Sequence, residues 1–72
     1  MLPLSFAEPL VPQSIAKITG RDEVRRHLSE LGLVVGEEVT VVSSLAGNLI
    51  VQVKDSRIAL DRELANRIMI RG

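Results

Sequence analysis

The chain contains no cysteine, no tryptophan and no tyrosine, and Phe6 is its only aromatic residue. Without cysteine it can form no disulfide, no thiolate metal site and no thiol nucleophile, which fits a reducing compartment. Grooves for proline-rich peptides and stacking platforms for single-stranded nucleic acid are both built from aromatic side chains. The composition therefore argues against a peptide-binding SH3 domain and against a nucleic-acid-binding barrel.

The chain also lacks an excess of charge of either sign and any long hydrophobic run. Nine basic residues balance nine acidic ones, so nothing steers it to phosphate backbones or anionic lipid. No apolar stretch approaches the ~20 residues that a membrane-spanning helix needs. Residues 1–13 contain three prolines and no basic residue, unlike a signal peptide. We therefore expect a cytoplasmic protein that neither binds nucleic acid nor inserts into a membrane.

Catalytic motifs are missing as well. The sequence holds no Walker loop, no glycine-rich phosphate cradle and no recognisable Ser/His/Asp order. Its acidic residues are spread evenly among basic ones, so no acid/base couple stands out. We expect a protein that is not an enzyme.

What the sequence does have is a clear change of hydrophobic period. Val24, Leu28 and Leu31 recur at helical spacing and predict a helix over residues 23–31, with Thr19 or Asp22 as its cap. Gly32 then stands where a helix commonly ends in the left-handed conformation. A second glycine, Gly36, opens a turn, and a β-branched run with period 2 follows it.

The remaining pattern predicts short strands that form a small barrel. A strand over residues 14–19 would place Ala16 and Ile18 on one face and Ile15 and Lys17 on the other. A hairpin turn at residues 46–48 and a one-turn helix over 61–65, capped by Asp61, divide the later strands. The expected inward residues are Val39, Val41, Leu49, Val51, Val53, Ile58, Leu60, Ile68 and Ile70. Short sheets need closure to protect their edges, so we predict a mainly β fold with one helix: a small, partly open, five-stranded SH3-like barrel.

We expect two regions along the 72 residues: an irregular N-terminal lead-in over 1–13, with Leu4 and Phe6 docked on the barrel, and the barrel domain over 14–72. The ordered motifs of the second region resemble the FeoA family of ferrous iron transport proteins. They are Ile18-Thr19-Gly20, Leu28-Ser29-Glu30-Leu31-Gly32-Leu33, Gly36 with Val39, Val41 and Val42, Gly47-Asn48-Leu49-Ile50-Val51, Arg57-Ile58-Ala59-Leu60, and Leu64-Ala65.

This resemblance implies an SH3-like fold and a cytosolic accessory protein that binds and modulates the GTPase part of a FeoB-type membrane transporter. The same fold is the C-terminal domain of metal-dependent repressors, so a transition-metal-binding sensor domain is the alternative. Since no DNA-binding helices precede the barrel, a free-standing FeoA-like protein is the expectation. Whether the domain forms a weak homo-oligomer through its sheet edges is left open.

A weak site for a divalent transition metal such as Fe²⁺ is one candidate for chemistry. Glu23, His27 and Glu30 lie at i−4, i and i+3 on the predicted helix, and imidazole with two carboxylates suits ferrous iron. The alternative is a solvated helix face with weak charge pairs, in which Arg26 competes for the carboxylates.

Two apolar sets are candidates for partner binding. Val42, Ile50, Ile15 and Met69 fall on the face opposite the expected core, and exposed apolar patches often mark partner surfaces. The second set is Leu28 and Leu33 at the helix and its exit, where the resemblance suggests docking. The alternative for the first set is burial, because a strongly curved barrel covers residues on both sides and a one-residue slip in register moves every side chain to the other face. The alternative for Leu28 and Leu33 is that they simply pack the helix onto the barrel.

Overall fold

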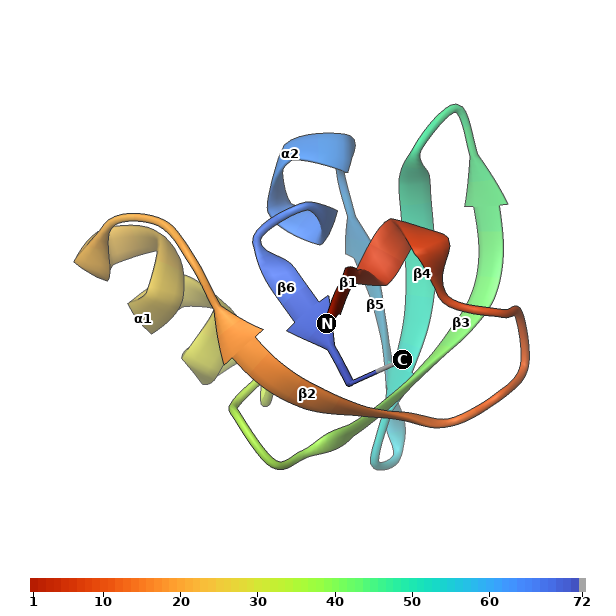
Figure 1. Ribbon diagram of the computed structural model, residues 1–72, viewed down its shortest axis with the longest axis horizontal. Coiled ribbons are helices and arrows are strands. Elements are labelled where there is room, and N and C mark those ends of the chain that lie inside the picture. The colour runs from red at the N-terminus through yellow and green to blue at the C-terminus, as the bar shows by residue number, and fades with distance from the viewer. Residues whose placement is uncertain (72) are drawn as a thin grey trace.

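Six antiparallel strands form one strongly bent sheet in the order β1-β6-β2-β3-β4-β5 (Figure 1). The computed structural model describes residues 1–71. The strands are β1 (Leu2–Pro3), β2 (Gln13–Ile18), β3 (Glu38–Leu45), β4 (Asn48–Val53), β5 (Ser56–Leu60) and β6 (Ile68–Ile70). The helices are η1 (Leu4–Phe6, a 3₁₀ turn), α1 (Asp22–Glu30) and α2 (Arg62–Ala65). The mainly β, open SH3-like architecture with one main helix is thereby confirmed.

The sixth strand comes from the segment that we expected to be irregular. Leu2 pairs with Ile70 and Pro3 with Met69, so β1 extends the sheet beyond β6. The 3₁₀ turn that follows buries Leu4 completely in the core. Phe6, which we also expected to dock, is 71 % exposed. Leu4 and the two residues of β1 therefore hold the N-terminal segment against the rest of the protein. The sheet has six strands because of β1, whereas the sequence predicted five.

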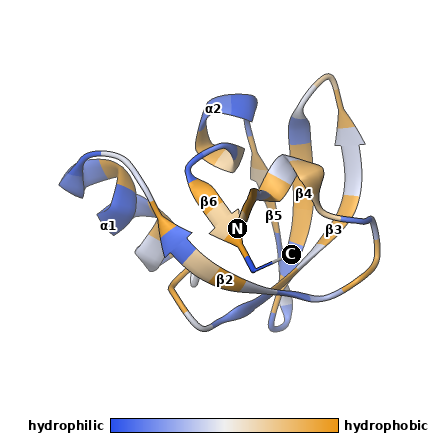
Figure 2. Ribbon diagram, in the orientation of Figure 1, coloured by the Kyte–Doolittle hydropathy of each residue, from blue (hydrophilic) through white to orange (hydrophobic). Residues whose placement is uncertain are grey.

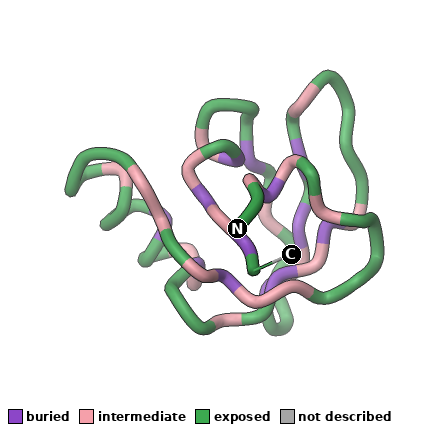
Figure 3. Tube along the Cα trace, in the orientation of Figure 1, coloured by how far each residue is buried: buried purple, intermediate pink, exposed green. Residues whose placement is uncertain are grey.

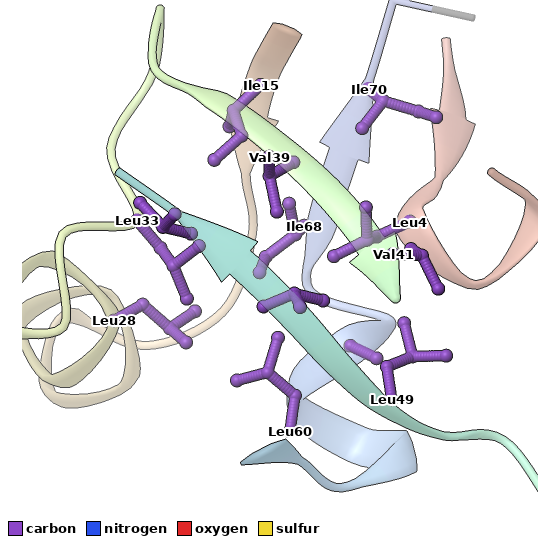
Figure 4. Packing of buried hydrophobic residues seen from close by; sticks show 13 residues of the cluster. Leu4, Ile15, Leu28, Leu33, Val39, Val41, Leu49, Leu60, Ile68 and Ile70 are labelled. Carbon is purple, nitrogen blue, oxygen red and sulfur yellow. The ribbon is translucent and has the colours of Figure 1, made fainter. Parts of the chain in front are cut away.

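The alternating pattern after Gly36 predicts the core of β3, β4 and β5 correctly. Tight turns join these strands, and Ala46 and Gly47 adopt the positive φ angles of +53° and +87° in the first of them. The buried cluster contains all but one of the expected inward residues, Ile58 being half-buried. Figure 3 shows the buried positions alternating along the strands, and Figure 4 shows these side chains meeting between the two halves of the sheet.

The expected faces of β2 are wrong. Ile15 was assigned to the outer face, but it is 1 % exposed and belongs to the core. The pairing of β2 with β6 shifts between Ile15 and Lys17, so a bulge places an extra residue in β2. Ala16 and Ile18 are half-buried as a result, and Lys17 stays exposed. A bulge of this kind leaves no signature in a period-2 pattern.

Helix α1 projects from one end of the sheet and is polar over most of its surface (Figures 1 and 2). Its N-cap is Arg21, which makes no side-chain capping bond, so neither Thr19 nor Asp22 has the expected role. Thr19 instead donates its hydroxyl to the carbonyl of Arg67 (3.4 Å), and Asp22 pairs with Arg25 (2.7 Å). The helix ends before Gly32, whose φ of +91° confirms the predicted left-handed stop.

Candidate functional site

An open, mainly apolar groove of about 640 Å³ lies between the β3–β4 hairpin, the end of β5 and α2. Its lining residues are Ser43, Leu45, Asn48, Leu49, Ile50, Ala59, Leu60, Asp61 and Leu64. Asp61 is its only ionisable residue, so the groove offers hydrophobic contact and little charge. Concave apolar sites with a few polar groups are typical places for a ligand or a partner.

A row of side chains across three strands forms the floor of the groove. Ile50 of β4 pairs with Ser43 of β3 and with Ala59 of β5, so the three share the outer face of the sheet. The larger Ile50, which is 36 % exposed, thus stands between two small neighbours. At the hairpin end of the groove, Leu45 is 80 % exposed. Two aliphatic side chains are therefore presented together on one surface.

The hairpin is tied to α2 by Arg62. Its Nε and Nη2 donate to the carbonyl of Ala46 at 3.2 and 2.8 Å, and its backbone N–H donates to Oδ1 of Asn48 at 2.9 Å. Asp61 in turn caps α2, as the sequence predicted, by accepting the N–H of Leu64 at 2.9 Å. These bonds hold the two walls of the groove in place, so the groove is preformed.

A matched pair of glycine substitutions tests this clamp. Gly47 and Gly36 have similar φ angles of +87° and +93°, but a Cβ on Gly47 would lie 2.7 Å from Nε of Arg62, whereas a Cβ on Gly36 would meet nothing within 4 Å. We expect Gly36→Ala to lower the free energy of unfolding by about 1 kcal/mol, the cost of the left-handed conformation. Gly47→Ala should lower it by about 2 kcal/mol, because it also displaces Arg62.

Urea denaturation followed by circular dichroism measures both values. In a protein that already carries Arg62→Ala, Gly47→Ala should lower the free energy of unfolding only as much as Gly36→Ala does, because the obstructing side chain is then absent. Equal losses in the two single variants would show that Arg62 moves aside without cost and does not clamp the hairpin.

The structure separates the residues that we predicted to bind a partner. Ile50 lines the groove, and Val42 is half-buried at the shift in pairing between Val41 and Ser43, outside the groove lining. Leu28 and Leu33 are 0 % exposed and belong to the core cluster, which corrects their assignment to a docking surface. They pack the helix and its exit against the sheet, as Figure 4 shows.

The predicted metal ligands remain on the surface of α1. Glu23, His27 and Glu30 are all exposed. Among residues 1–71, no group of three or more histidine, cysteine, aspartate or glutamate side chains could hold a metal ion. The structure therefore does not bring the trio together as a ligand set, and metal binding by these residues stays a prediction.

Sequence reasoning found one residue of the groove floor and missed most of the walls. Leu45 and Leu64 come from separate elements, and only the fold brings them to the same surface. Leu45 did carry a usable signal, because it is an apolar residue directly before a glycine hairpin turn.

Within the described part of the chain, no helix is long and apolar enough to cross a membrane.

Comparison with known proteins gives one consistent family. The family model of the FeoA domain matches residues 2–72. "Putative Fe(2+) transport protein A" of Methanocaldococcus jannaschii is 31 % identical over 70 residues, covering 97 % of this chain and 85 % of that protein.

Solved structures show the same fold. An iron uptake regulatory protein (FeoA) has a TM-score of 0.87 and 33 % identity, covering 97 % of this chain and 93 % of its own. Stenotrophomonas maltophilia FeoA, an SH3 domain protein crystallised with zinc, has a TM-score of 0.82 and 30 % identity, covering 97 % and 89 % of the two chains. A manganese-dependent transcriptional repressor shares only the fold: its TM-score is 0.85 with 17 % identity, and the match covers 94 % of this chain but 39 % of the repressor.

Proposed function

The chain belongs to the FeoA domain family of ferrous iron transport accessory proteins, and from that premise we propose that it binds and modulates the cytosolic GTPase domain of a FeoB-type transporter. In this proposal the protein is cytosolic and catalyses no reaction. The preformed apolar groove around Ile50 is the observation that supports a docking role. A partner that covers the groove would remove Leu45 and Ile50 from water, which is the main driving force of most protein association.

Docking would act on the transporter by a shift in population. A ligand changes an equilibrium between two states only by the difference in its affinity for them. The accessory protein would therefore raise the fraction of whichever transporter state presents the matching surface. The groove is rigid enough for this, because Arg62 and Asp61 fix the hairpin and α2 before any partner arrives.

An amide NMR titration tests the proposal directly. Isotope-labelled protein is titrated with the cytosolic domain of the FeoB-type transporter from the same organism, in its GDP-bound and GTP-analogue-bound forms. We expect shifts that cluster on the hairpin, the end of β5 and α2. A parallel titration uses the whole transporter in nanodiscs, so that a surface present only in the membrane protein is also sampled. An absence of shifts in both titrations would refute the proposal.

Metal-dependent docking is a second candidate, favoured by the zinc complex of the Stenotrophomonas maltophilia relative. The described residues of this chain do not form a ready ligand set, so we derive no step through a metal. Repeating the titration with Fe²⁺ under anaerobic conditions separates the two candidates. Docking that appears only with iron favours the sensor, whereas equal docking in both arms favours the simple accessory protein.

A further inference from the structure

Strand β5 is an open edge of the sheet. The sheet ends at β1 on one side and at β5 on the other. The edge at β1 is two residues long and includes Pro3, which has no N–H to offer. Strand β5 has five residues, pairs with β4 without a shift in register and contains no proline. It therefore lacks the bulges and prolines with which proteins often block pairing at an edge.

The register shows which groups of β5 are unpaired. A two-residue turn joins Val53 to Ser56, so these residues form a hydrogen-bonded pair, and such pairs alternate along an antiparallel ladder. Ile58 and Leu60 therefore also direct their backbone groups towards β4. The N–H and C=O of Arg57 and Ala59 point away from β4, into the open edge. Both residues are exposed.

The groove lies beside this unpaired edge. Ala59 lines it and is paired with Ile50, so a residue placed opposite Ala59 on an added strand would have its side chain on the same face. The methyl group of Ala59 leaves that side chain free to reach Ile50 and Leu64. A large aliphatic side chain matches this apolar space.

The charge of Arg57, next to the groove, indicates which residue an added strand would carry two positions away from the aliphatic one. Arg57 is two residues before Ala59 on the same face, and its Nε donates to Oε1 of Gln52 at 3.0 Å, which holds the guanidinium over the outer face of the sheet. No ion pair of Arg57 is found among the described residues. A carboxylate opposite Arg57 would complement it, because opposite charges directly across a strand pair stabilise it.

We propose that β5 accepts an extended segment of the transporter by antiparallel strand addition, which continues the pairing of the rest of the sheet and is more stable per residue than parallel pairing. The segment carries a large aliphatic residue opposite Ala59 and an acidic residue two positions further towards its C-terminus, opposite Arg57. Main-chain bonds supply affinity in this mode, and the alternate side chains supply specificity. The inference rests on the proposed function and adds to it the edge, the direction and the sequence pattern of the bound segment.

Amide hydrogen exchange in the complex with the transporter's cytosolic domain tests strand addition. The amides of Arg57 and Ala59 should become protected, at least about tenfold over the free protein, while the amide of Ile58, already bonded to β4, should change little. Protection that alternates in this way is specific to an added strand. Binding without it would overturn the inference and leave the proposed function intact, whereas no binding would overturn both.

Charge reversal at Arg57 supplies the second test. Arg57→Glu should weaken binding of the cytosolic domain about tenfold or more, because like charges would then face each other across the new pair. The matched control is Arg26→Glu, which makes the same change in net charge at an exposed position of α1. Exchanging the acidic residue of the transporter segment for lysine should restore binding to Arg57→Glu. Equal losses in the two variants, or no rescue, would overturn the inference.

A proline at position 59 removes the outward N–H without touching a bond to β4. Ala59→Pro should therefore weaken binding more than Ala59→Ser does, because only the proline removes the N–H, while circular dichroism still reports the folded sheet for both variants. If Arg57 and Ala59 are already protected in concentrated protein alone, and the protection falls on dilution, the occupant is a second copy of this chain and the inference is overturned.

Discussion

Replacing Leu28 with alanine is expected to lower the free energy of unfolding by about 2–5 kcal/mol, the usual range for a leucine removed from a core. Leu28 is the only fully buried residue of α1 and is 0 % exposed. The rest of the helix offers only half-buried Val24 as apolar support, so the cavity left behind cannot be filled by a neighbour on the same helix. Domains of this size have a net stability of similar magnitude, roughly 5 kcal/mol or less. We therefore expect a largely unfolded variant.

Urea denaturation followed by circular dichroism gives the value, with Leu45→Ala as its control. Leu45 is 80 % exposed, and its loss should change the free energy of unfolding by less than about 0.5 kcal/mol. The comparison uses the same chemical change at a buried and an exposed leucine. A Leu28→Ala protein as stable as the parent would contradict the prediction, because it would show that Leu28 does not hold α1 on the sheet.

The sequence predicts the core of the β3–β5 half well, because only one shift in pairing, between Val41 and Ser43, interrupts its alternation. Val39 and Val41 alternate without interruption, and Gly47 marks the turn that follows them. The burial of Ile15 could not be read in the same way, since a bulge shifts the pairing of β2 and exchanges its faces. Leu2 and Pro3 carry no strand pattern of their own, and they are held only by the partner strand β6.

The site was less predictable than the fold because it depends on distances between segments. Ile50 could be found as an apolar residue on the outer face, but its surroundings could not. The clamp from Arg62 to Ala46 spans 16 residues, and nothing local in the sequence indicates it. The resemblance suggested docking at Leu28 and Leu33, and an apolar stripe in the sequence does not reveal whether a partner or the protein's own sheet covers it.

Ile50→Asp is expected to weaken binding to the transporter's cytosolic domain by about 30-fold or more, while the protein stays folded. Ile50 lies at the centre of the groove floor, and central, well-packed residues carry most of the binding energy of an interface. An aspartate there would bring an unpaired charge under the bound partner, close to Asp61 in the same groove. Because Ile50 is already 36 % exposed, we expect the free energy of unfolding to fall by only about 1 kcal/mol.

Isothermal titration calorimetry measures the affinity, and Val35→Asp is the matched control. Val35 is 63 % exposed, is apolar and β-branched like Ile50, and lies outside the groove lining. Introducing the same charge there should leave the affinity within about twofold, since only a group covered by the partner contributes to binding. Ile50→Thr should give an intermediate loss, because it keeps the β-branched shape without the charge. Normal binding by Ile50→Asp would show that the transporter docks elsewhere, because a buried and unpaired carboxylate cannot be accommodated at no cost.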